Sequence, residues 1–252
     1  MSTHHQRKSF PFATPLWGVR PRALLLLVGG LACIGAPQVH AQPVVLPPGL
    51  GGSQSYRLMF VTAGTRDALS GNITDYNTFV NSAANAVPEL AALGTEFRVL
   101  GSTQTVNARD NLDFGGANDV PIFRLDGNQI ANNNADLFDD LILNPINVDE
   151  LGNPVGDQTV FTGSFTDGTL SGVQSFGAGA TTLVGSSAAT DGDYIFGTIA
   201  DSDTAQRFYA LSGVLTIPEP ATATLLLFCA VGLLHRGFHG AFNAPHRGGG
   251  LR

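Results

Sequence analysis

The sequence predicts an α+β fold, and three observations predict it. One helical pattern lies early, over 73–93, strand-like runs of apolar and β-branched residues recur from 56 to 217, and turn signals built from Gly, Asn and Asp separate them. With 31 glycines the chain is rich in turns, yet its 43% of hydrophobic residues exceeds what disordered chains contain. A helix early and many short strands late favour a mainly antiparallel sheet.

Composition divides the chain into five segments. We expect a signal peptide at 1–41, a Pro/Gly/Ser linker at 42–55 and one α+β domain at 56–217. A short apolar segment follows at 218–236, and a polar tail, expected to be disordered, occupies 237–252.

The N-terminal segment has the parts of a signal peptide. Residues 1–22 carry four basic residues and no acidic one, 23–36 are apolar or small, and Val39 and Ala41 are the small residues of a cleavage site. We therefore expect export, with cleavage after Ala41. A retained membrane anchor is the alternative, although the run is shorter than the roughly 20 residues that span a bilayer.

The first half of the domain predicts a strand, a helix and further short elements. Residues 56–62 are typical of a strand, and 73–93 of a helix with Thr74 as N-cap and Pro88 near its end. The expected buried stripe of this helix is Tyr76, Phe79, Val80 and Ala83.

Shorter elements follow the helix. Strands are expected at 95–102, with Phe97 and Val99 on one face, and at 122–125 before an Asp126-Gly127 turn. A short helix beginning near Asn133 or Asn134 would bury Leu137 and Phe138, with Leu141 as a further candidate.

The second half predicts strands separated by a long loop. A strand begins at 159, a low-complexity surface loop is expected at 168–192, and closing strands at 193–200 and 207–217. The aromatic residues of the strand-like runs should belong to the core: Phe97, Phe123, Phe161, Phe196 and Tyr209.

Charge is placed unevenly along the chain. Residues 42–217 hold six arginines and no lysine against nineteen acidic residues, a net charge of −13, whereas the whole chain carries −7. Such a surface repels phosphate backbones, which argues against nucleic acid, and accommodates cations or neutral glycans. Solubility outside the cell is the simpler interpretation.

The domain lacks three residue types on which common catalytic mechanisms depend. Cys33 and Cys229 lie in the two apolar segments, all six histidines lie outside 42–217, and Lys8 is the only lysine. Disulfides, thiolate or imidazole zinc sites, and Ser-His-Asp, Cys-His or Schiff-base chemistry are therefore excluded in this domain. We expect no cofactor and no enzymatic activity.

Acidic residues remain as candidates for binding or catalysis. Asp149, Glu150 and Asp157 lie in an oxygen-rich loop of the kind that binds Ca²⁺, although no EF-hand spacing is present. Asp139-Asp140, or Glu96 with another acid, would be the carboxylate pair of a glycosidase. Solvated turns are the simpler interpretation in each case.

The C-terminal apolar segment is isolated by its flanks. Pro218 and Pro220 around Glu219 hold the chain extended and stop a helix from continuing backwards. As a helix, 221–234 would be roughly 21 Å long, against a hydrocarbon core of about 30 Å. Arg236 follows and favours a cytoplasmic tail.

These C-terminal residues resemble the PEP-CTERM sorting signal of exported proteins in Gram-negative bacteria. The match is Pro218-Glu219-Pro220, the apolar run 221–234 and Arg236, combined with an N-terminal signal. The resemblance implies processing by an exosortase near the Pro-Glu-Pro, a transient membrane contact through 221–234, and association with exopolysaccharide or biofilm. The lone Arg236 and the tail at 237–252 depart from the family's denser basic cluster and earlier stop.

The order of segments in the domain resembles the endostatin-like branch of the C-type lectin-like fold. The resemblance covers most of 56–215 and rests on LMFV followed by ALSG, DYNTFV, GTEFRVLGS, VPIFRLDGNQI, ADLFDD, VFTGSFTDG and LVGSSAATDGDYIF. Disulfides, the basic heparin-binding surface and the calcium-dependent sugar motif of relatives are missing, and Phe161 stands where relatives favour Trp. The resemblance implies a fold and leaves the ligand open.

The sequence thus predicts an exported, non-catalytic structural or adhesive component of the cell envelope or extracellular matrix. A carbohydrate-binding module is the alternative, and a hydrolase using carboxylates alone is a third hypothesis. No ligand-binding residue is predicted.

Overall fold

The computed structural model describes residues 44–116 and 119–217. The predicted signal peptide with Ala41, the sorting residues Pro218, Glu219, Pro220 and Arg236, the apolar run and the polar tail lie outside the described residues. In the described part, no helix is both long enough and apolar enough to cross a membrane.

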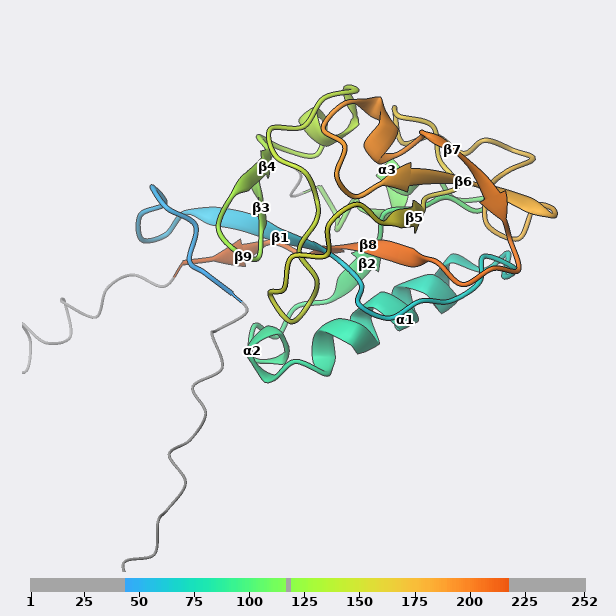
Figure 1. Cartoon of the computed structure of the whole chain (residues 1–252). Coiled ribbons are helices and arrows are strands. Elements are labelled where there is room, and N and C mark those ends of the chain that lie inside the picture. Colours follow the sequence, from blue (N-terminus) through green and yellow to red (C-terminus); the bar gives the residue numbers. More distant parts are fainter. Residues whose placement is uncertain (1–43, 117–118, 218–252) are drawn as a thin grey trace, which may run out of the picture. The chain divides into compact units, whose positions relative to one another are not determined.

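A nine-stranded sheet forms the centre of the domain (Figure 1). Its main path is β4-β3-β1-β8-β5-β6-β7, with β2 also paired to β8 and β9 to β1. The strands are β1 (Ser55–Val61), β2 (Phe97–Val99), β3 (Ile122–Arg124), β4 (Gln129–Ala131), β5 (Thr159–Phe161), β6 (Thr181–Ser186), β7 (Thr198–Asp201), β8 (Arg207–Ser212) and β9 (Leu215–Thr216). All pairs are antiparallel except β1 with β3 and β5 with β8.

Few helices accompany the sheet. They are α1 (Ile73–Asn85), α2 (Pro88–Ala91) and α3 (Ala108–Asn111), with 3₁₀ turns η1 (Asp136–Phe138) and η2 (Gly192–Tyr194). Figure 1 shows α1 beside β2 and β8. The predicted α+β class, with its main helix early and a mostly antiparallel sheet, is confirmed.

The sheet separates two hydrophobic cores. Successive side chains of a strand point to opposite faces, so Leu58 and Phe60 of β1 enter one core while Met59 and Val61 enter the other. Tyr76, Val80 and Ala84 of α1 close the first core, and Tyr194 belongs to the second.

Aromatic rings around Phe208 fill the first core. Its ring centroid lies 5.5 Å from Tyr76, 5.7 Å from Phe79, 5.8 Å from Phe161 and 5.6 Å from Phe176. Aromatic pairs at this spacing add to the free energy gained by burying their area. Phe208 thereby joins α1, β5 and the segment before β6 through one side chain.

The predicted helix over 73–93 is two helices. Asn72, not Thr74, is the N-cap, since Asn72 Oδ1 accepts the Thr74 N–H at 3.1 Å. The first helix ends at Asn85, and Pro88 opens α2, a position that suits a residue without an N–H. Ala84 rather than Ala83 completes the buried stripe.

The prediction of a surface loop at 168–192 holds for part of this stretch and is wrong at Phe176 and at 181–186. β6 (Thr181–Ser186) pairs between β5 and β7, and Phe176 before it is fully buried. The small residues serve close packing here, because a Cβ on Gly185 would lie 2.0 Å from the Tyr194 carbonyl oxygen. The low-complexity stretch therefore contains an irregular segment, in which Val173 is 75% exposed, followed by a buried strand.

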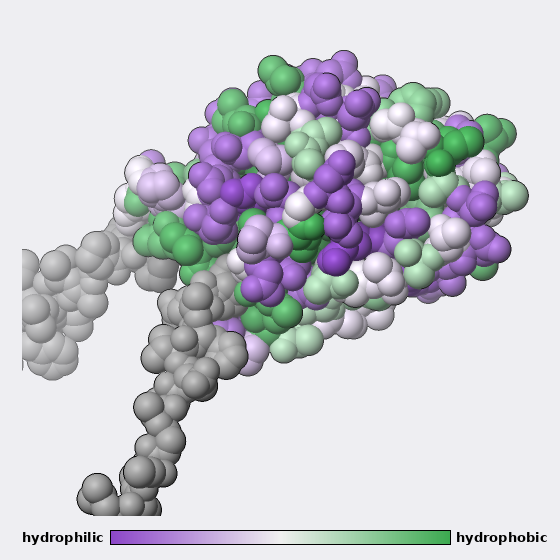
Figure 2. All heavy atoms as spheres, viewed as in Figure 1, coloured by the Kyte–Doolittle hydropathy of each residue, from purple (hydrophilic) through white to green (hydrophobic). Residues whose placement is uncertain are grey.

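Two further predictions need correction. The described part of the linker packs on the domain, because the Val45 N–H donates to the Leu125 carbonyl and the Ser53 N–H to the Ile217 carbonyl. Phe196, expected in the core, is 41% exposed. On the face shown in Figure 2, hydrophobic residues form small separate groups among hydrophilic ones.

Candidate functional site

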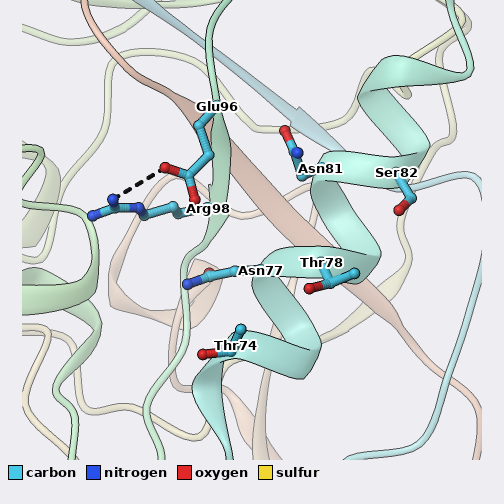
Figure 3. Close-up of a pocket in the computed structure, with 7 residues that line it drawn as sticks. All are labelled: Thr74, Asn77, Thr78, Asn81, Ser82, Glu96 and Arg98. Carbon is cyan, nitrogen blue, oxygen red and sulfur yellow. Dashed lines mark hydrogen bonds and ion pairs between the residues drawn. The ribbon is translucent and has the colours of Figure 1, made fainter.

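A polar groove runs between α1 and β2. Its volume is about 320 Å³, and Figure 3 shows side chains from both elements facing it. The lining residues are Thr74, Asn77, Thr78, Asn81, Ser82, Glu96 and Arg98.

The spacing along α1 creates one wall of the groove. Five polar residues recur at intervals of three and four, which places them on one face of a helix. Tyr76, Val80 and Ala84 form the neighbouring stripe that is buried in the core. The polar stripe is therefore held at the sheet by the apolar stripe beside it.

Two asparagines of α1 complete the hydrogen bonds of β2. The strand pairs with β8 along one edge only. At its other edge the Phe97 N–H donates to Asn81 Oδ1 at 3.0 Å, and the Val99 N–H donates to Asn77 Oδ1 at 2.9 Å. These amides occupy the place of a neighbouring strand and satisfy donors that would be costly to leave unpaired.

A third asparagine extends this network to α3. Asn77 Nδ2 donates to Asn111 Oδ1 at 2.9 Å, and Asn111 Nδ2 donates to the Val99 carbonyl at 2.8 Å. Asn111 is 7% exposed, so its bonds form largely away from water. α1, β2 and α3 are thus fixed relative to one another by amide side chains.

Glu96 and Arg98 form the charged end of the groove. Arg98 Nη2 lies 3.1 Å from Glu96 Oε2, and its Nη1 donates to the Asn111 carbonyl at 3.3 Å. The guanidinium carbon lies 4.3 Å from the centroid of the Phe114 ring. Arg98 is therefore oriented by three partners.

A second guanidinium contacts the same ring from inside the domain. Arg57 is fully buried and lies 4.8 Å from the Phe114 centroid. Its Nε donates to the Ser212 carbonyl at 2.8 Å and its Nη2 to the Leu112 carbonyl at 3.0 Å. Burial, followed by the charge of Arg98, lowers the pKa of Arg57 to about 10, against the opposing effect of Asp113. The Phe114 ring that Arg98 contacts is therefore also contacted by a buried arginine, which backbone carbonyls hold in place.

Several polar groups of the groove are available to a ligand. Thr74, Thr78 and Ser82 are exposed, and among the described residues no partner is found for their side-chain hydroxyls. The hydroxyls and the Asn81 amide can each donate or accept next to the Glu96–Arg98 pair. Such a set can bind a ligand rich in hydroxyl groups. With Glu96 as its one carboxylate, it lacks the acid pair of a glycosidase.

The calcium candidates are engaged in other bonds. Asp149 Oδ1 accepts the Leu151 and Asn153 N–H groups, and Glu150 Oε2 accepts the Ala63 N–H at 2.7 Å. Asp157 Oδ1 accepts the Ser186 hydroxyl. Within 44–116 and 119–217, no three His, Cys, Asp or Glu side chains cluster as metal ligands would.

The glycosidase candidates lie in different places. Glu96 lines the groove, whereas Asp139 and Asp140 follow η1 and contribute to the electrostatics around Tyr194. The structure therefore does not join Glu96 with the 139–140 acids in one site.

Of the groove residues, the sequence had assigned a role only to Thr74, as a helix N-cap, and to Glu96, as an acid. The signal was present as polar residues at i, i+3, i+4, i+7 and i+8 of the helix. The apolar stripe of the same helix predicts its buried face, but it does not show which element the polar stripe beside it meets. Neither a scan against protein-family models nor a search of curated proteins finds a match for this chain.

Replacing Asn81 by Ala should lower the free energy of unfolding by about 1–2 kcal/mol. The Phe97 N–H loses its acceptor, and the better helix propensity of Ala offsets only part of that loss. Urea denaturation measures the change through the midpoint. Thr78→Ala on the same face should stay within about 0.5 kcal/mol of the parent, and equal losses in both variants would contradict the role of Asn81.

Replacing Glu150 by Gln should stabilise the protein at neutral pH. Burial and the nearby Asp149 raise the pKa of Glu150, against the hydrogen bond from Ala63. A raised pKa means that this residue contributes most stability below its unfolded pKa, about 4.3, and that the contribution is lost as pH rises through the folded pKa. The melting temperature of Glu150→Gln should therefore exceed that of the parent by more at pH 7 than at pH 4.

A matched control removes one exposed carboxylate, by Glu89→Gln on α2. Its difference from the parent should change less between the two pH values. An advantage of Glu150→Gln that shrinks toward pH 7 would refute the burial argument.

Proposed function

We propose that this chain is an exported, non-catalytic adhesive component of the cell envelope or extracellular matrix, and that it contacts exopolysaccharide through the α1–β2 groove. The observation that carries the proposal is the lining of the groove. Hydroxyls, an amide and one oriented charged pair stand side by side on rigid elements. Polysaccharides present the complementary hydroxyl groups at a regular spacing.

The charge of the domain supports this choice of ligand. A net charge of −13 over 42–217 disfavours polyanions such as nucleic acids. A neutral sugar polymer is not repelled, and its hydroxyls can both donate to Glu96 and accept from Arg98. Such contacts are weak one by one, but many copies of the protein bound along one polymer chain can together hold a matrix.

The finer fold assignment also belongs to the proposal. The early helix, the mostly antiparallel sheet and the segment order are compatible with a C-type lectin-like, endostatin-like domain. Sugar binding would then not use calcium through Asp149, Glu150 and Asp157, since these side chains already accept other hydrogen bonds.

Sorting is proposed from the sequence of the two ends. Cleavage after Ala41 would release the domain outside the inner membrane, and residues 221–234 would hold it there briefly. An exosortase would then process the chain near Pro218-Glu219-Pro220. Export to the outer surface follows from this order of events.

Binding is tested with the full-length chain in mild detergent on an array of neutral polysaccharides. Wild-type protein should be retained, and Thr78→Ala/Ser82→Ala should weaken retention about 5-fold or more, as expected when two hydrogen bonds are removed. Thr198→Ala on β7 removes an exposed hydroxyl outside the groove and should bind like the parent. Equal binding by all variants, or none by the parent, would leave the groove without this function.

Sorting is tested by fractionation of cells that make the chain. Replacing Glu219 by Ala and Arg236 by Gln should leave the exported domain folded but retain it at the inner membrane, because the processing signal is altered. Thermal melting of the variant checks that the domain is intact. An unchanged distribution between membrane, surface and medium would rule out the sorting role of these residues.

A further inference from the structure

An aromatic pair stands on the surface away from the groove residues. Phe165 and Phe196 are 40% and 41% exposed, and their ring centroids lie 5.8 Å apart at an interplanar angle of 73°. Phe165 lies in the segment after β5, and Phe196 lies in the segment after η2. Edge-to-face packing holds the two rings together while leaving aromatic surface open to solvent.

The segments that carry the rings are anchored in the second core. Ile195, next to Phe196, is fully buried, and its carbonyl accepts the Thr162 hydroxyl at 2.6 Å. The Phe196 N–H donates to the Gly192 carbonyl at 2.9 Å, and the Phe165 N–H to the Thr169 carbonyl at 2.9 Å. The pair is therefore positioned before any ligand arrives, which lowers the entropy cost of binding.

Carboxylates from two segments lie near the chain that carries the pair. Asp193 lies in η2, three residues before Phe196. A Cβ built on Gly192 of η2 would lie 2.9 Å from Thr166 Cγ2, next to Phe165, and 3.5 Å from Asp140 Oδ1, after η1. The turn after η1 therefore lies close to the two segments that carry the rings. Figure 1 shows this turn and η2 side by side, as the bridge between Leu141 and Asp191 requires.

Asp139 and Asp140 belong to the same group of charges. Burial raises the pKa of the Tyr194 hydroxyl, two residues before Phe196, and the charges of these two acids raise it further. The five residues Phe165, Phe196, Asp139, Asp140 and Asp193 are called the aromatic platform below. Their three acids are exposed and form none of the ion pairs seen among the described residues.

We infer that the aromatic platform binds a polysaccharide built from amino sugars with free, protonated amines. The apolar face of a pyranose ring can lie against Phe165 or Phe196, and an ammonium group is attracted both to an aromatic face and to the nearby carboxylates. The inference does not depend on the groove, whose lining contains none of these residues.

Charge complementarity selects this occupant over others. The domain carries −13 over 42–217, so a polycation is attracted along its whole length. Hydrogen bonds from Thr169 lower the pKa of Asp167, two residues after Phe165, and the charge of Arg109 helps to lower it. Arg109 also forms an ion pair with Asp110, with 3.9 Å between Arg109 Nε and Asp110 Oδ1. A basic protein would need an interface of roughly 1,000 Å² or more, whereas two rings and three carboxylates suit one or two sugar units repeated along a polymer.

The test measures binding of chitosan oligosaccharides to the full-length chain at a mildly acidic pH by calorimetry. We expect saturable binding that falls as salt rises, since the contact is electrostatic. Phe165→Leu/Phe196→Leu keeps apolar area but removes the aromatic faces, and should weaken binding about 10-fold. Asp139→Asn/Asp140→Asn/Asp193→Asn should weaken it similarly and reduce its dependence on salt.

One control variant and two probes make the result decisive. Glu89→Gln/Asp201→Asn/Asp203→Asn removes the same charge outside the platform and should bind nearly as the parent does. Fully N-acetylated oligosaccharides should bind much more weakly than chitosan. Equal binding of the acetylated form, full affinity in the leucine variant, or tighter platform-dependent binding of polylysine would each overturn the inference.

Discussion

Strand β2 joins the sheet along one edge, and the hydrogen bonds of its other edge must be satisfied elsewhere. Asn77 and Asn81 satisfy them from α1, so the same contacts complete the sheet and hold the helix on it. The one-turn spacing that aligns the two amides also aligns Thr74, Thr78 and Ser82 beside them. The groove therefore follows from the way this strand edge is closed.

Two arginines of the domain form contacts with buried groups in its interior. Arg57 donates to backbone carbonyls in complete burial, and Arg66 lies 4.4 Å from the Tyr76 ring centroid. The ion pairs of the described residues join side chains at most two positions apart in the sequence. The exposed ones among them contribute little to stability, whereas Arg124 and Asp126 form a half-buried pair with two hydrogen bonds. Most carboxylates form no ion pair among the described residues and give the domain a negative surface. Such a surface does not repel a neutral polymer and attracts a cationic one.

Sequence reasoning succeeded where one local pattern decides the outcome. The strand that contains Phe97 and the inward position of Tyr76 follow from alternation and helical period, and both are found as expected. It failed where burial depends on distant neighbours. Phe176 lies in a glycine-rich stretch that looks like a loop, yet it packs against Tyr76 at 4.4 Å between ring centroids. Phe196 lies in a strand-like run, yet the chain turns at η2 and leaves its ring exposed.

By itself, the sequence determined the α+β class, the absence of Cys, His and Lys chemistry in the domain, and the strong negative charge, because these properties depend on composition and local period alone. Only the tertiary structure decided which polar residues meet. The groove joins α1 to a strand edge, and the aromatic platform joins segments that follow η1, β5 and η2. Such sites depend on strand pairing between residues far apart in the chain, and no local pattern encodes that pairing.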